Sequence, residues 1–382
     1  MARLGTETAF EVLVRARALE AQGKHIVHLE IGEPDFDTPS NVIEAAVEAL
    51  HHGYTHYGPP AGLPELRQTI ADYVARTRSI SVSPDEVVVV PGGKPIIFYV
   101  VMALVEEGDE VICPNPGFPI YESMINFVGA HAVPIPIRES KSFSLDINEL
   151  ADLIAERTRL IILNSPHNPT GGTMSERDVR DVAAAIGDRN ITVLSDEIYS
   201  RLVYEGNHFS LMSVEGFRDR TVLLDGFSKT YAMTGWRMGY GVMRADLATH
   251  VTRLAINCNS CTATFTQIAG VEALRGSQAS VDRMKEEFRR RRDRFVERLN
   301  SIRGFSCRMP KGAFYVFPNI SKTGWRSKDL ASALLEQAGV ACLSGTAFGA
   351  HGEGYIRFSV ANSIENLDLA ADRIGSWAKK NV

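Results

Sequence analysis

A lysine among aromatic side chains is the residue of this sequence best suited to covalent chemistry. Lys229 lies in the segment FSKTYAMTGWR, residues 227–237. Apolar surroundings lower the pKa of a lysine, and the neutral amine is a nucleophile suited to Schiff-base formation. Arg237, eight positions later, carries a planar fork of donors that matches a phosphate. A lone lysine is more often a surface charge, so this interpretation needs support from other segments.

Three further segments with polar residues or glycines directly follow predicted strands. The GGK sequence at 92–94 could bring backbone N–H groups to an anion at a helix start, although a plain turn explains the glycines equally well. The rigid loop NSPHNPTGG, residues 164–172, could hold Asn168 toward a ligand, or Asn168 could be a structural turn residue. Asp196, three residues before Tyr199, is either a buried carboxylate that needs a cation or a solvated helix N-cap.

Together these segments match what pyridoxal 5′-phosphate (PLP) requires. They combine an anion cradle, a carboxylate, an Asn–Tyr pair and an activated lysine. The carboxylate keeps the pyridine nitrogen protonated, so that the ring can accept electrons from a developing carbanion. All four segments are expected at the carboxyl ends of strands, where α/β sheets bind their ligands.

The scaffold for these segments is predicted from alternating β-branched runs and helical stretches. The predicted strands are residues 87–90, 110–113, 132–135, 160–163, 191–195, 221–225 and 238–242. This alternation predicts an α/β fold with a mostly parallel seven-stranded sheet that is covered by helices on both faces.

The pattern changes after about residue 247 and predicts a second, smaller α+β domain. Its expected elements are a long helix near 278–300, a strand at 313–317, a helix near 330–337 and a strand at 354–359. We therefore expect an N-terminal segment (1–40) packing with the small domain, a large PLP-binding domain (41–275) and a small C-terminal domain (276–382).

Composition excludes several classes of protein. The chain has 382 residues, 45% hydrophobic content and a formal net charge of −5, which argues against disorder and against a nucleic-acid-binding surface. There is no apolar run of about 18 residues, so no membrane helix is expected. The N-terminus does not resemble a signal peptide. The arginine-rich stretch 289–294 is flanked by acidic residues, which predicts a solvated, salt-bridged helix face.

The cysteines and histidines give no sign of a disulfide framework or a metal site. Five scattered cysteines favour a reducing compartment, and we expect a cytoplasmic protein. The CxxC sequence at 258–261 has no second pair, so we interpret it as two half-buried thiols. The adjacent residues His51 and His52 are expected at the surface, because neighbours on a helix point in different directions.

Seven stretches of the sequence resemble the fold-type I PLP enzymes, specifically class I aminotransferases of the aspartate aminotransferase kind. The resemblance runs from about residue 29 to 358, and it is closest to the bacterial subgroup that carries GEPDFDTP. Ser-Lys followed by Gly-Trp-Arg is its most specific part. The stretches are GEPDFDTP (32–39), YGPPAG (57–62), GGK (92–94), NPTG (168–171), SDEIY (195–199), AMTGWR (232–237) and GAFY (312–315).

The resemblance implies roles for the residues around the cofactor ring. Lys229 would bind PLP covalently and then act as the general base. Asp196 would pair with the pyridine nitrogen, and Tyr199 and Asn168 would hydrogen-bond the phenolic oxygen. Phe118 would stack on the ring.

The resemblance also implies a phosphate site that is shared between two subunits. Gly93, Lys94, Ser228 and Arg237 would hold the phosphate. Tyr57 would reach the phosphate of the neighbouring subunit, so the expected assembly is a homodimer with shared active sites.

The substrates implied are an amino acid and a 2-oxo acid. Arg357 would bind the substrate α-carboxylate as a fork, helped by Gly32 and Asn168. Lys94 would favour an acidic side chain, which predicts glutamate and 2-oxoglutarate as one substrate pair and aspartate as a further donor; alternatively, Lys94 only adds charge near the phosphate.

Two departures from the family bear on these expectations. Gly226 replaces a phosphate-binding serine of many relatives, and TAFEV at 8–12 lacks the polar pattern of aspartate-specific members. A donor such as alanine or an aromatic amino acid therefore stays open, as does a PLP-dependent lyase reaction on the same scaffold. A non-catalytic PLP-binding sensor is disfavoured, because no DNA-binding domain fits before Leu29.

Overall fold

Seven strands form the central sheet of the computed structural model, which describes residues 3–382. Their order is β2-β8-β7-β6-β5-β3-β4; β8 is antiparallel to both of its neighbours, and the other pairings are parallel. The predicted sheet is thus confirmed. The strands are β2 (Val87–Val90), β3 (Glu110–Asn115), β4 (His131–Pro136), β5 (Thr158–Asn164), β6 (Thr192–Asp196), β7 (Thr221–Gly226) and β8 (Gly239–Val242).

Helices cover both faces of this sheet because its strands are apolar on both sides. In β2, Val88 and Val90 pack with one helical layer, whereas Val87 and Val89 pack with the other, as the two-residue period of a strand requires. The first layer contains α4 (Lys94–Leu104), α5 (Pro119–Val128) and α8 (Ala245–Asn259). The second contains α3 (Pro64–Arg78), α6 (Ile147–Leu153), α7 (Glu176–Ile186) and α9 (Thr264–Arg275).

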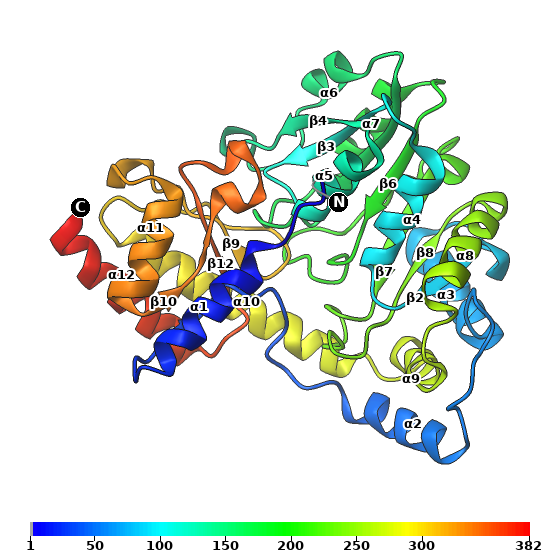
Figure 1. Cartoon of the computed structure of the whole chain (residues 1–382), viewed down its shortest axis with the longest axis horizontal. Helices are drawn as coiled ribbons and strands as arrows, with labels where there is room; N and C mark the ends of the chain where they lie inside the picture. Colours follow the sequence, from blue (N-terminus) through cyan, green and yellow to red (C-terminus); the bar gives the residue numbers. More distant parts are fainter. Residues whose placement is uncertain (1–2) are drawn as a thin grey trace.

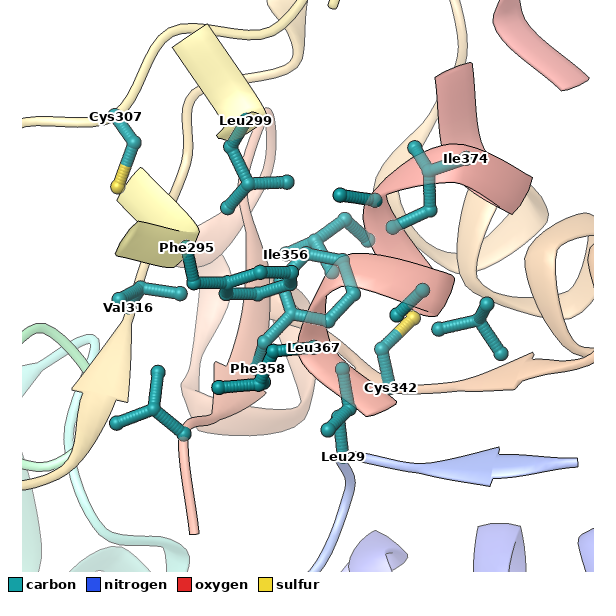
Figure 2. Packing of buried hydrophobic residues seen from close by; sticks show 14 of the residues in the cluster. Leu29, Phe295, Leu299, Cys307, Val316, Cys342, Ile356, Phe358, Leu367 and Ile374 are labelled. Atoms are coloured by element: carbon teal, nitrogen blue, oxygen red, sulfur yellow. The ribbon is translucent and has the colours of Figure 1, made fainter. Parts of the chain in front are cut away.

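The C-terminal part of the chain forms the smaller α+β unit with a core of its own. A three-stranded antiparallel sheet has the order β11-β12-β9, and Figure 2 shows Phe295, Ile356, Phe358 and Leu367 close together in the core beside it. The expected strand at 313–317 is shorter than predicted, and the last turns of the helix near 330–337 are of the π type. The elements are α10 (Ala279–Asn300), β9 (Tyr315–Val316), α11 (Ser327–Ala333), β10 (Val340–Ala341), β11 (Leu343–Ser344), β12 (Ile356–Ser359) and α12 (Ile364–Asn381).

The N-terminal helix packs with this smaller unit rather than with the central sheet. In α1 (Thr8–Glu20), Ala16 is buried against Leu335 and Ala341, and β1 (Val27–His28) pairs in parallel with β10. Figure 1 shows α1 beside the C-terminal elements, whereas α2 (Ser40–His51) lies next to α9. We propose domain boundaries near residues 40 and 275 on this basis.

The arginine-rich stretch of α10 corrects one prediction. Arg291 and Arg292 are buried, so 289–294 is not a fully solvated face. Arg291 donates to Asp35 Oδ1 at 2.7 Å, and Arg292 donates to the carbonyl of Pro310 at 2.5 Å. A buried guanidinium needs such partners. Asp35 lies far away in the sequence, so local patterning could not identify it.

The thiols and the surface agree only in part with the sequence interpretation. All five cysteines are free; Cys261 is half-buried as expected, but Cys258, near the end of α8, is exposed. His51 and His52 are exposed, as predicted.

Within residues 3–382, no helix is long and apolar enough to cross a membrane, and no group of three or more metal-binding side chains is present.

Candidate active site

The four segments singled out in the sequence meet at one edge of the central sheet. Strands β2, β5, β6 and β7 run in the same direction, and the residues at and after their carboxyl ends line one cavity of about 970 Å³. This is where parallel sheets place their ligands. The predicted residues that line the cavity are Gly32, Gly93, Lys94, Phe118, Asn168, Asp196, Tyr199, Ser228, Lys229, Arg237 and Arg357.

Lys229 follows β7, and its half-buried side chain lines the cavity. Its Nζ donates to the carbonyl of Gly32 at 2.5 Å and lies 5.9 Å from the ring centre of Phe314. Burial lowers the pKa of Lys229 to about 8. The amine is therefore partly neutral near physiological pH, as the apolar composition of its segment suggested.

Asp196 is the last residue of β6 and is also buried. Its Oδ2 accepts a hydrogen bond from the hydroxyl of Tyr121 at 2.5 Å, and its Oδ1 accepts one from the backbone of Ile198 at 3.2 Å. Burial raises the pKa of Asp196 to about 6 in spite of these donors. Asp196 forms no ion pair with any residue between 3 and 382, so a cation in the cavity would satisfy its charge. The sequence did not identify Tyr121, which α5 supplies.

Arg357, on β12, extends into the same cavity from the smaller unit. Its Nη1 donates to Asn168 Oδ1 at 3.3 Å, its Nη2 donates to the carbonyl of Glu30, and it lies 4.5 Å from the ring centre of Tyr315. Burial lowers the pKa of Arg357. Among the described residues, no carboxylate pairs with Arg357 and its buried Nε has no partner. A substrate carboxylate would supply the missing acceptors.

Tyr199 follows β6 by three residues and has a tyrosine partner. The hydroxyls of Tyr199 and Tyr315 are 2.7 Å apart, and burial raises the pKa of Tyr199 well above its usual value. Tyr199 is thus a neutral phenol that can donate one hydrogen bond. Tyr315 belongs to the GAFY motif, but its pairing with Tyr199 was not predicted.

The start of α4 has the features of an anion site. Gly92 has a φ of +89°, and a side chain there would collide with the guanidinium of Arg237. The glycine therefore lets Arg237 approach the exposed N–H groups that begin at Gly93, where α4 has no side-chain cap. At Gly226, a Cβ would lie 3.0 Å from the Cα of Gly239, so a larger residue would require the neighbouring backbone to move slightly.

Lys94 has a partner that the sequence did not reveal. Its Nζ forms an ion pair with Glu7 Oε1, at a point where both residues line the cavity. The same Nζ lies 5.7 Å from the ring centre of Phe118. Tyr57, in contrast, is 89% exposed and does not line the cavity. Its expected contact with a second subunit stays a prediction.

Comparisons with known proteins agree with this geometry. The family model for aminotransferase class I and II matches residues 24–374. An aspartate aminotransferase of Pyrococcus horikoshii is 42% identical over 95% of this chain and 92% of its own length. Aromatic-amino-acid aminotransferase 2 of Thermococcus litoralis is 37% identical over 94% of both chains. The structure of the aspartate aminotransferase from Rhizobium meliloti has a TM-score of 0.95 and 34% identity, covering 100% of this chain and 99% of that one.

Proposed function

Because this chain belongs to the PLP-dependent aminotransferases of classes I and II, we propose that it exchanges amino groups between glutamate or aspartate and a 2-oxo acid. The cycle is ping-pong, and 2-oxoglutarate is one of the oxo acids. The observation that carries this proposal is the position of Lys229 and Arg357 in one cavity. A half-buried amine of lowered pKa thus shares the cavity with a guanidinium that has no carboxylate partner among residues 3–382.

The residues of the cavity fit PLP by their chemistry. When bound, PLP supplies an electron sink that stabilises negative charge on the substrate α-carbon. Lys229 would hold the cofactor covalently, and Asp196 would keep the proton on its ring nitrogen. Gly93, Ser228 and Arg237 would hold its phosphate, which the open N–H groups at the start of α4 support.

The chain's own residues would orient the substrate and move its proton. Arg357 binds the α-carboxylate in two parallel hydrogen bonds, and its burial makes each of them stronger. Lys229, whose pKa of about 8 is close to neutral pH, would both accept and return the proton of the α-carbon. Tyr199 and Asn168 would donate hydrogen bonds to the phenolic oxygen of the cofactor, Asn168 without any change of charge.

We further propose a homodimer in which Tyr57 enters the partner's site. Its exposed ring would otherwise remain in water. Ile43, Val47 and Leu50 of α2 are also exposed, and a continuous apolar helix face of this kind is typical of a subunit interface. The free thiols support a cytoplasmic location.

Lys94 is the residue that we expect to select acidic donors. Lys94→Met should raise KM for aspartate, glutamate and 2-oxoglutarate by roughly ten- to a hundredfold, the scale of one lost charge-assisted contact. KM for alanine and for an aromatic donor should hardly change. Steady-state kinetics with each donor against 2-oxoglutarate, pyruvate and oxaloacetate would measure both effects.

An equal rise in KM for every donor would show that Lys94 serves the cofactor instead. Apolar donors are the second candidate, because Phe10 and Phe118 line the cavity. The relative named for aromatic amino acids supports the same alternative. A wild-type enzyme that turned over phenylalanine but neither aspartate nor glutamate would favour this alternative.

A further inference from the structure

The N-terminal segment places a carboxylate where an acidic substrate is expected to bind. Glu7 immediately precedes α1 and lines the cavity together with Thr8, Ala9 and Phe10. Its carboxylate pairs with Lys94, and no other cation between residues 3 and 382 forms an ion pair with it. The protein thus carries, in its own chain, a group with the chemistry of a substrate's distal carboxylate.

Contacts on both sides hold Glu7 in this place. Before it, the backbone N–H of Gly5 donates to Ser123 Oγ of α5 at 2.8 Å. After it, α1 is anchored to the smaller unit through the buried residue Ala16. The segment that lines the cavity therefore has its ends attached to different parts of the molecule, and these attachments keep Glu7 next to Lys94.

We infer that Glu7 is a specificity-determining residue, an internal counter-ion that a substrate carboxylate must displace from Lys94. This inference rests on the proposed function, because it takes Lys94 to contact the substrate side chain. With an acidic donor, Glu7 competes for Lys94 and weakens binding. With an apolar donor, Glu7 stays in place and neutralises a charge that would otherwise face the apolar side chain.

The strength of the pair suits such an exchange. The Lys94 side chain is 43% exposed and the Glu7 side chain 19%, so water screens their attraction. Partly exposed ion pairs are weak enough for a substrate carboxylate to replace them. The ring of Phe118 lies beside the pair and Phe10 lines the same cavity, so an unpaired ammonium there would disfavour an apolar ligand. A balanced pair therefore lets one site accept both kinds of donor.

Glu7→Gln tests this inference through two unreactive ligands that bind the holoenzyme. Succinate carries a second carboxylate, and 3-phenylpropionate carries an apolar group instead. Glu7→Gln should tighten succinate binding by about two- to fivefold and weaken 3-phenylpropionate binding by a similar factor, the scale of a partly exposed ion pair. Titration calorimetry gives both dissociation constants, whose ratio should change by about tenfold.

Two controls separate the counter-ion role from a general effect of charge. Glu11→Gln changes an exposed glutamate of α1 that does not line the cavity, so both constants should stay as in the wild type. In the Lys94→Met background, Glu7→Gln should no longer weaken 3-phenylpropionate, because no ammonium then needs neutralising.

The inference is overturned if the ratio changes less than twofold in Glu7→Gln. It is also overturned if Glu11→Gln changes the ratio in the same way. A third contradicting result is that Glu7→Gln still weakens 3-phenylpropionate binding in the Lys94→Met background. Neither ligand has to react, so these constants are measurable even in a protein without transaminase activity. A wild-type enzyme that fails to transaminate glutamate would contradict the proposed function, whereas an active enzyme with an unchanged ratio would contradict only the role of Glu7.

Discussion

Lys229→Ala is expected to abolish transamination, with a loss in kcat of roughly 10⁴-fold, the upper range for removal of a positioned acid–base group. The reason is that no other amine can replace it. Lys94 is the other lysine that lines the cavity in the described part of the chain, and its Nζ is paired with Glu7. A coupled assay with glutamate and oxaloacetate measures the loss.

The matched variant Lys229→Arg separates charge from nucleophilicity. Arginine keeps a cation at this position but stays protonated at neutral pH, so it is not a nucleophile. The Lys229→Arg variant should therefore lose as much activity as Lys229→Ala. Near-ultraviolet circular dichroism would show whether the fold is retained. Turnover close to the wild-type rate in either variant means that Lys229 is not the catalytic amine.

Asp196→Asn should have the second-largest effect, a loss of roughly 10²- to 10⁴-fold in the half-reaction with amino acid. Asparagine has nearly the same shape but cannot carry the negative charge that would keep a proton on the pyridine nitrogen. Rapid-mixing absorbance measurements with glutamate follow this half-reaction directly.

Tyr121→Phe is the control for this variant. It removes one hydrogen bond to the Asp196 carboxylate and leaves the charge in place, so a loss of no more than about tenfold is expected. If Asp196→Asn reacted as fast as the wild type, the carboxylate would have no role in the chemistry. Equal losses in the two variants would indicate that the hydrogen bond matters more than the charge.

The sheet and the position of the site could be predicted because both depend on local pattern. Runs such as Val87–Val90 are apolar and β-branched on every residue, as a strand buried on both faces requires. The polar and glycine residues that follow those runs lie at one sheet edge, since strands running in the same direction end on the same side.

The contacts within the site could not be predicted in the same way, because they join residues far apart in the chain. Tyr121 and Asp196 are separated by 75 positions, and Glu7 and Lys94 by 87. No periodicity links such pairs, and neither Tyr121 nor Glu7 stands out by its neighbours. Arg291 shows the same limit, since its partner Asp35 is 256 positions away.

The substrate assignment was also limited by what the sequence could show about Lys94. Its place after two glycines indicated a cation at a helix start beside the phosphate. Lys94 is not an unpaired cation, because Glu7 forms an ion pair with it. The position of Glu7 follows from how α1 packs on the smaller unit. The proposed role of Lys94 in specificity therefore depends on tertiary packing as well as on the motif.

The most direct test of the account is a single half-reaction of the wild-type holoenzyme with glutamate and no acceptor. We expect one equivalent of 2-oxoglutarate to be released per active site, after which release stops and no ammonia is formed. Addition of oxaloacetate should then yield one equivalent of aspartate. Continuous formation of an oxo acid together with ammonia, or no 2-oxoglutarate at all, would contradict the proposal that this protein is an aminotransferase acting on glutamate.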